Sequence, residues 1–516
     1  MTDRIRLNEG NRRWWTLAAM CFALFMIMLD NTVVNVALPS IQEDLGASLS
    51  GLEWTVNAYT LTFAVLLVTG GRLGDIFGRR RMFLFGAVVF AISSAAIGLS
   101  PNDGSLVAGR AVQGIGAAFM MPATLSIITV TFPPEERGKA IGTWAGVSAL
   151  ALAIGPVVGG ALAEYVSWRA IFFLNLPVAV GAVVVTLFAT RESRDESTTH
   201  TIDWGGIVAL SLGLTALVLA LVEGNSLGWG SPEIVALLVT AGIGVAGFAL
   251  IEPRVREPMV DFPLFRSKTF LGANLVAFII TFSMLAMFFF LALYMQNILG
   301  YSAVEAGVRF LPITLMIVLI APVAGRLSDR IGPRPLMVGG LSLTAIALFL
   351  LTRIDVDTGY GLLLPAFIVM GMGIALVMSP MSTAAMNAVT PEKSGVGSGI
   401  LSMSRMVGAT FGVAAIGALF QHLASDQLSR ELAGTGISAA QRERIVDNLG
   451  SASDATGLPP QAVDAAQHAF IHALSSGMWL SAGVAALGAV LSLWLIAPKR
   501  DAAARPDAAA EVASQT

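Results

Sequence analysis

Two ionisable residues stand inside long apolar stretches of this 516-residue chain. Asp30 follows an apolar run that starts near Trp14, and Arg110 lies within the apolar stretch 105–128. A charged side chain at the centre of a membrane helix costs roughly 2.5–3.5 kcal/mol, so it marks a functional site by default. A carboxyl group there can bind and release a proton, because burial favours its neutral form and a neighbouring guanidinium favours its charged form. The two residues therefore indicate a device that moves protons.

Asp30 and Arg110 are expected at one depth in a membrane. At about 1.5 Å per residue, Asp30 lies about 24 Å along its helix from Trp14. The helix that carries Arg110 runs the other way and places it about 8 Å below the outer face. We therefore expect direct or water-bridged contact. Two interpretations remain open: the pair couples a proton gradient to transport, or it is a static pair that fixes helix packing. Coupling is favoured, because apolar side chains could replace a static pair at little cost.

The composition excludes several other classes of protein. Of all residues, 55% are apolar and 13% are charged, whereas a soluble domain usually has about a quarter charged residues. The net charge of −3 argues against a nucleic-acid partner. The single cysteine, Cys21, excludes an internal disulfide framework and a cysteine-rich zinc site. No phosphate-binding loop is present, so we expect no cofactor and no metal. The four histidines lie outside the apolar stretches, which argues against an intramembrane enzyme.

Fourteen stretches are long and apolar enough to span a membrane as helices. They cover residues 15–38, 53–72, 82–100, 105–128, 139–163, 170–190, 204–222, 232–251, 269–297, 305–325, 335–353, 361–381, 397–420 and 473–496. No stretch alternates with period two over about ten residues, so the expected fold is all-α and polytopic. If both termini are cytoplasmic, most Lys and Arg residues lie on the cytoplasmic side of the membrane. Because basic residues concentrate in cytoplasmic loops, we expect this orientation.

The chain contains a repeat. The segment Gly71-Arg-Leu73-Gly-Asp75 returns as Gly325-Arg-Leu-Ser-Asp329, about 255 residues later. We therefore expect two bundles of six helices, with two inserted helices between them. The expected divisions are residues 1–200, 201–268 and 269–500, with a long extracellular loop at 421–472 and a disordered cytoplasmic tail at 501–516.

The repeated segment is expected to form a cytoplasmic gate. Glycines permit a tight turn and close helix approach, while the carboxylates and arginines can form a charged latch between the halves. Alternatively, the arginines serve only as topology signals. The gate candidates are Gly71, Leu73, Asp75, Gly78, Arg79, Arg80, Asp329 and Arg330.

Several motifs resemble the major facilitator superfamily, and specifically its fourteen-helix drug:proton antiporter branch. They are Leu29–Pro39, Trp54–Tyr59, Gly71–Arg81, Leu106–Gly116, Gly155–Gly160 and Trp168–Pro177. The resemblance covers nearly the whole chain. It implies a monomeric, multi-pass protein of a bacterial-type cytoplasmic (inner) membrane. Its partners would be protons, the lipid bilayer and a hydrophobic small-molecule substrate.

The same resemblance implies proton-coupled efflux of hydrophobic or amphiphilic drugs, dyes or antiseptics by alternating access. The alternative within transport is a dedicated exporter of one metabolite or self-produced antibiotic. An antiporter helix motif is implied at Gly146, Gly155, Pro156, Gly159 and Gly160. From the residues alone, Gly155 and Gly159 could equally be a small-residue pair that permits close helix packing.

The substrate cavity is expected to be apolar in the second half and to carry a few polar groups. The candidates are Asn35, Asn57, Tyr59, Gln113, Phe288, Tyr294, Gln296 and Arg405. The sequence departs from this branch at Arg405. Some members carry additional acidic residues deep in the second half, which help to recognise cationic drugs, whereas this chain has an arginine there. Three interpretations of Arg405 stay open: it faces the cavity, binds an anionic group, or extends toward the membrane interface.

Overall fold

A computed structural model describes residues 9–197, 201–432 and 460–499. Fourteen helices within these ranges are long and apolar enough to span a membrane, and the described part contains no strand. The all-α polytopic fold expected from the sequence is therefore confirmed. The predicted tail at 501–516 lies outside the described residues.

The first half contains six helices in sequence order. They are α1 (Glu9–Leu45), α2 (Leu49–Phe77), α3 (Arg79–Gly98), α4 (Asp103–Thr131), α5 (Pro134–Tyr165) and α6 (Trp168–Ala189). Two inserted helices follow, α7 (Trp204–Leu227) and α8 (Pro232–Ile251).

The second half repeats this plan with one broken helix. Its elements are α9 (Lys268–Leu293), the π-helical turn η3 (Tyr294–Ile298), α10 (Ala303–Arg309), α11 (Leu311–Ile331), α12 (Pro333–Leu351), α13 (Tyr360–Asn387), α14 (Ser394–Glu431) and α16 (Pro460–Leu495). The predicted span 305–325 is thus built from α10 and α11, which meet at Phe310.

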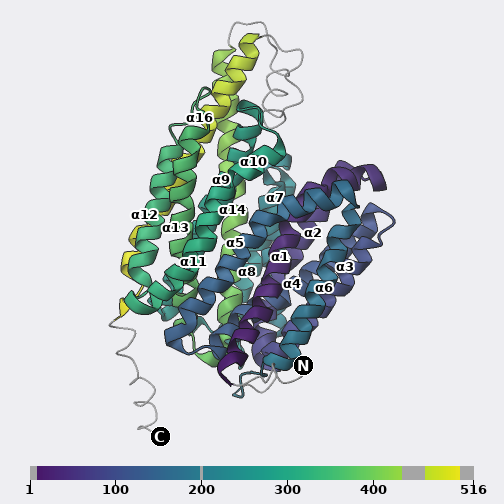
Figure 1. Cartoon of the computed structure of the whole chain (residues 1–516), viewed down its shortest axis with the longest axis vertical. Helices are drawn as coiled ribbons and strands as arrows, with labels where there is room; N and C mark the ends of the chain where they lie inside the picture. Colours follow the sequence, from purple (N-terminus) through teal and green to yellow (C-terminus); the bar gives the residue numbers. More distant parts are fainter. Residues whose placement is uncertain (1–8, 198–200, 433–459, 500–516) are drawn as a thin grey trace, which may run out of the picture.

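The two halves stand side by side and diverge toward one end (Figure 1). The start of α1 and the end of α16 both lie at the opposite end, where the halves converge. We call these the open end and the closed end. Helix α7 contacts α2 of the first half and α14 of the second, so the inserted pair lies along the junction. There the Asn225 side chain donates a hydrogen bond to the Ala414 carbonyl.

Local sequence explains the tight turns at the closed end. Gly78 lies between α2 and α3 with φ of 111°, and its repeat Gly332 lies between α11 and α12 with φ of 89°. Such angles are strained for residues that carry a Cβ. A Cβ on Gly78 would also lie 2.6 Å from the Glu192 carboxyl carbon. The repeat therefore preserves a backbone requirement.

Two helices extend well into the segment that the sequence assigned to an outer loop. Residues 421–431 continue α14, and residues 460–472 begin α16. Leu428, Leu432, Ala462, Ala465 and Ala469 pack them together. The middle of the predicted loop, 433–459, lies outside the described residues.

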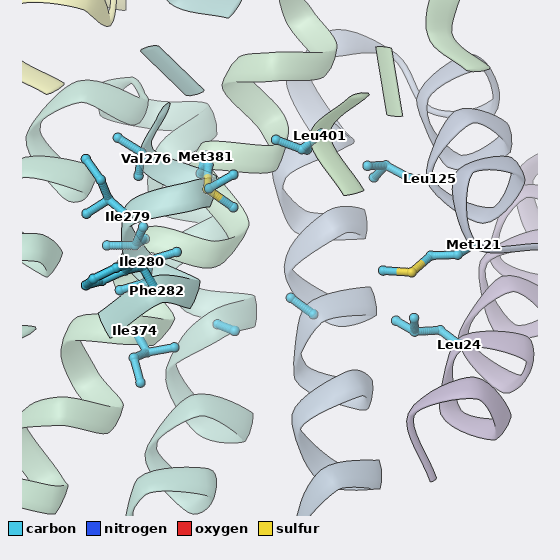
Figure 2. Packing of buried hydrophobic residues seen from close by; sticks show 14 of the residues in the cluster. Leu24, Met121, Leu125, Val276, Ile279, Ile280, Phe282, Ile374, Met381 and Leu401 are labelled. Atoms are coloured by element: carbon cyan, nitrogen blue, oxygen red, sulfur yellow. The ribbon is translucent and has the colours of Figure 1, made fainter. Parts of the chain in front are cut away.

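A single large apolar cluster connects the two halves. Figure 2 shows Leu24, Met121 and Leu125 on the first-half side, and Ile279, Phe282, Met381 and Leu401 on the second-half side. These residues come from α1, α4, α9, α13 and α14. The inner faces of both halves are therefore apolar where they approach one another.

Candidate functional site

Asp30 and Arg110 form an ion pair in the interior of the first half. Arg110 Nη1 lies 2.5 Å from Asp30 Oδ2, and each residue is only 1% exposed. The pair joins α1 to α4, which run in opposite directions. The contact that the depth arithmetic predicted is present.

Three neutral side chains complete a polar cluster around Asp30. The Gln113 side chain donates to Asp30 Oδ1 at 3.0 Å, and the Asn175 side chain donates to the same oxygen at 2.9 Å. Both amides also donate to the Ser94 hydroxyl, at 2.8 and 3.3 Å. The cluster thus links helices α1, α3, α4 and α6, and Asp30 accepts hydrogen bonds from two amides as well as from Arg110.

Arg110 is held by contacts other than Asp30. Its Nε donates to the Thr55 carbonyl at 3.0 Å, and its Nη1 donates to Gln113 Oε1 at 2.6 Å. Its Cζ lies 4.2 Å from the centre of the Tyr59 ring, close enough for a cation–π interaction. These contacts hold the guanidinium in place independently of Asp30.

Sequence reasoning missed Asn175 and Ser94 as members of this site. Each is a small polar residue within an apolar stretch, and each is buried. A small polar residue within an apolar stretch is the signal that could have identified them, since a buried polar side chain needs hydrogen-bond partners. Gln113 and Tyr59 were expected in the substrate cavity, and the structure places both side chains against Arg110.

Asp75 is buried between the halves at the closed end. Its Oδ1 accepts a hydrogen bond from the Gly395 N–H, and its Oδ2 accepts one from the Val396 N–H, both at 2.8 Å. Arg79 lies 2.6 Å from Asp75 and donates to the carbonyls of Pro391 and Glu392. Asp75 and Arg79, on α2 and α3, therefore hold the start of α14.

The repeat forms the reciprocal contact. Asp329 on α11 accepts hydrogen bonds from the Gly138 N–H at 2.9 Å and the Lys139 N–H at 3.0 Å, at the start of α5. Gly71 packs against Gly395, and Gly325 packs against Gly138, so closely that a Cβ on either would overlap a backbone carbonyl. We call the contact of Asp75 and Arg79 with the start of α14, together with the contact of Asp329 with α5, the latch.

Other gate candidates lie outside the latch. The Arg80 side chain donates to the Leu187 carbonyl at the end of α6, within its own half. Arg330 is exposed, and Leu73 borders a small hollow with Thr69 and Asp203. The structure thus places Gly71, Asp75 and Arg79 in one contact between the halves and Asp329 in the other, whereas Arg80 belongs to neither.

The glycines of α5 contact two different partners. Near the closed end, a Cβ on Gly146 would lie 3.6 Å from Pro322 on α11 of the second half. Farther along, Gly155 packs against Thr32 and Gly159 against Val33 on α1, while Gly160 has only Val36 at 3.7 Å. The helix continues through Pro156 without a break. Gly155 and Gly159 therefore allow α5 to approach the turn that follows Asp30.

The remaining cavity candidates are dispersed. Asn35 is exposed, and Asn57 borders a hollow of about 440 Å³ with Leu38 and Glu53 at the open end. Phe288 packs against Phe310 at 5.1 Å between ring centres.

The polar candidates at the end of α9 mainly contact backbone. Tyr294 is buried, and its hydroxyl donates to the carbonyls of Asp355 and Thr358 at 3.0 and 2.8 Å. Gln296 donates to the Ala292 carbonyl at 3.3 Å. Arg405, by contrast, lies where the halves meet, with its Cζ 5.9 Å from the Trp144 ring of α5.

Comparisons with known proteins agree with this architecture. The family model described as Major Facilitator Superfamily matches residues 20–413. The tetracenomycin C resistance and export protein of Streptomyces glaucescens is 35% identical, over 94% of this chain and 91% of its own. The multidrug resistance protein Stp of Mycobacterium tuberculosis is 34% identical, over 86% of this chain and 84% of its own. The methylenomycin A resistance protein of Streptomyces coelicolor is 34% identical, over 80% and 86%.

A solved structure shares the fold at low sequence identity. The crystal structure of the human organic anion transporter MFSD10 superposes with a TM-score of 0.63 at 15% identity. The match covers 93% of this chain and 99% of that one. At this identity the likeness establishes the fold alone.

Proposed function

The chain belongs to the major facilitator superfamily, and from this premise we propose that it exports hydrophobic or amphiphilic small molecules in exchange for protons. Transport proceeds by alternating access, in which the two halves rock about a central substrate site. The relatives named for multidrug resistance and for resistance to single antibiotics support export of drug-like molecules.

The observation that carries the proton part of the proposal is the buried Asp30–Arg110 ion pair. A carboxylate that gains a proton loses its attraction to the guanidinium and becomes an acceptor of weaker hydrogen bonds. Its three hydrogen-bond partners, Arg110, Gln113 and Asn175, lie on α4 and α6, so protonation changes the contacts between α1, α4 and α6. Those contacts are the means by which a proton can bias the arrangement of the first half.

We place the closed end on the cytoplasmic side of a bacterial-type inner membrane, with both termini cytoplasmic. The concentration of Arg and Lys residues in the segments at that end supports this orientation. The structure then corresponds to an outward-facing state, in which the latch seals the cytoplasmic side. A single chain contains both halves, so the transporting unit is a monomer.

Proton exchange in inside-out membrane vesicles tests the proposal. Respiration acidifies the vesicle lumen, and a substrate added outside should be exchanged for lumenal protons and make the lumen more alkaline. Asp30→Asn should reach the membrane and abolish this response. Asp44→Asn is the matched control, because Asp44 lies on the same helix but in a partly exposed ion pair with Arg169. A full response from the Asp30→Asn protein would contradict the proposal.

A dedicated exporter is the second candidate, and two of the relatives support it because their names each specify one antibiotic. Susceptibility of a pump-deficient strain to a panel of unrelated dyes and antibiotics separates the two. Protection against many compounds favours multidrug export, whereas protection against one compound favours the dedicated exporter.

A further inference from the structure

Arg405 is a buried cation without a carboxylate partner. It lies on α14 and is 8% exposed. Among the residues that the structure describes, it forms no ion pair; its Nη2 donates to the Ser382 hydroxyl, and its Nε is buried without a hydrogen-bond partner. A guanidinium carries five N–H donors, so most of its hydrogen-bonding capacity remains unused.

The guanidinium lies deep in the protein, at the junction of the halves. Arg405 is about 17 Å along α14 from Ser394, which places it well inside a membrane. Its Cζ lies 5.9 Å from the ring of Trp144, which α5 of the first half contributes. Alternating access changes the distance between these halves. A group bound at Arg405 would therefore be exposed to one side and then to the other.

Apolar residues precede Arg405 on its own helix face and adjoin its partner Ser382 in the sequence. Leu401 precedes Arg405 by one helical turn and lies between the halves with Met381 of α13 (Figure 2). Methionine side chains adapt their shape to different apolar partners. The site therefore combines a fixed positive charge with a flexible apolar wall, which fits an amphiphilic molecule that carries one negative group.

Two other buried arginines, one at the latch and one beside Asp30, have carboxylate partners that Arg405 lacks. Arg110 pairs with Asp30 and Arg79 pairs with Asp75. A buried charge without a counter-charge is costly, because water no longer solvates it and no anion replaces that solvation. A bound anion removes this cost and forms charge-assisted hydrogen bonds, which are among the strongest in proteins.

We propose that Arg405 binds an anionic oxygen group of the transported molecule, such as a carboxylate, phenolate or enolate. The substrates are then amphiphilic monoanions or acids with an apolar ring system. The inference rests on the proposed export function and specifies its substrate class. Asp30 binds the proton in the first half, while Arg405 binds the cargo in the second.

Binding of two dyes with related ring systems tests this substrate class. Fluorescein is an anion and tetramethylrhodamine methyl ester is a cation, and both contain a xanthene core. Their fluorescence anisotropy is measured on the full-length protein in lipid nanodiscs, for the wild type and for Arg405→Gln, Arg405→Lys and Arg353→Gln. Arg353 is an exposed arginine at the open end of α12 and is the matched control.

The proposal predicts that Arg405→Gln weakens fluorescein binding about tenfold or more, since a charge-assisted contact is lost. Arg405→Lys should retain part of the affinity, because it keeps the charge without the planar fork. Arg353→Gln should leave binding unchanged. Unchanged binding of the rhodamine ester to the Arg405→Gln protein, where the wild type binds it, excludes a folding defect.

Three results would overturn the inference. They are wild-type fluorescein affinity in Arg405→Gln, an equal loss of both dyes in that variant, and a wild-type protein that binds the cation but not fluorescein. The last result leaves the proposed function intact, because export of the cationic dye can still be measured in vesicles. A wild type that exports neither dye and no member of the antibiotic panel contradicts the proposed function itself.

Discussion

Asp75 on α2 accepts a hydrogen bond of 2.8 Å from the backbone N–H of Gly395, in the first turn of α14 of the opposite half. The repeat produces a similar contact in reverse, between Asp329 on α11 and Gly138, the fifth residue of α5. The first N–H groups of a helix, such as that of Gly395, have no partner within it, and the helix dipole favours a negative charge near the start of a helix. Each half therefore holds the start of a helix from the other half, and the closed end is secured by one device used twice.

The two contacts of the latch should differ in strength. Arg79 supports Asp75, but its counterpart in the repeat is Pro333, which has no charge. Hydrogen bonds to a charged group contribute roughly 1.5–3 kcal/mol. We expect Asp75→Asn to accelerate hydrogen exchange at Gly395 and Val396 by about tenfold to a hundredfold.

Asp329→Asn should produce a smaller acceleration at Gly138 and Lys139, since no buried arginine loses its partner there. Hydrogen-exchange mass spectrometry of peptides from the starts of α5 and α14 measures both effects, with each variant compared with the wild type. Equal effects of the two substitutions, or no effect of Asp75→Asn on α14, would contradict this account of the latch.

Gly325→Ala should open the closed end. The new Cβ would overlap the backbone carbonyl of Gly138, and a backbone group cannot rotate away as a side chain can. We expect the halves to part there, with faster labelling of a cysteine introduced at the buried Ser379 by an impermeant maleimide. Labelling should be done in a Cys21→Ser background, in inside-out vesicles.

Gly339→Ala is the control for this experiment, because no atom lies within 4 Å of a Cβ at that position on α12. It should leave labelling at position 379 unchanged. If Gly325→Ala also leaves labelling unchanged, close glycine contact does not hold the halves together.

Charge and the repeat made part of this structure predictable from sequence. A carboxylate and a guanidinium in apolar stretches are costly unless paired, and helix direction and rise placed Asp30 and Arg110 at one depth. The repeat identified Asp75 and Asp329 as equivalent. Each of these inferences depends on charge or spacing, which the sequence displays directly.

The partners of these residues were harder to predict. Asn175 and Ser94 are neutral, so their presence in a membrane helix costs less and gives a weaker signal than a charge. Asp75 accepts hydrogen bonds from backbone N–H groups of α14. Because every residue except proline carries a backbone N–H group, no residue type in the sequence indicates these partners. The lengths of α14 and α16 were also underestimated, because span length was judged from apolar residues alone, and the ends of these helices carry polar ones.

Gly155→Ala should destabilise the junction of α1 and α5 beside Asp30. A Cβ at this position would overlap the Thr32 side chain. Overpacking of this kind costs about 1–3 kcal/mol. Thr32→Ala removes the obstructing atoms, so the double variant should recover much of the stability. Gly160→Ala should be tolerated, because its nearest neighbour is 3.7 Å away.

Thermal unfolding of the detergent-solubilised protein can be followed through the reactivity of the single, buried Cys21. A Gly155→Ala protein as stable as the wild type would show that α5 moves away from α1 at little cost. Failure of Thr32→Ala to restore stability would locate the strain elsewhere.

A double-mutant cycle on Asp30 and Arg110 separates proton coupling from a static structural pair. Arg110→Met leaves the carboxylate buried without its counter-charge, which should cost about 3–5 kcal/mol. Adding Asp30→Asn removes that charge, while the new amide can still accept hydrogen bonds from Gln113 and Asn175. The double variant should therefore be more stable than Arg110→Met alone, with an interaction energy of about 1–3 kcal/mol in the Cys21 unfolding assay.

For this double variant, the static-pair interpretation and the proton-carrier interpretation both predict restored stability, but they predict different results for proton exchange. If the pair only fixes helix packing, the restored double variant should regain substrate-driven alkalinisation of inside-out vesicles. If Asp30 carries the proton, the double variant should fold, reach the membrane and bind substrate, yet show no alkalinisation, because no titratable group remains at position 30. A double variant that both folds and exchanges protons at the wild-type rate would assign the ion pair to structure and require a different proton carrier.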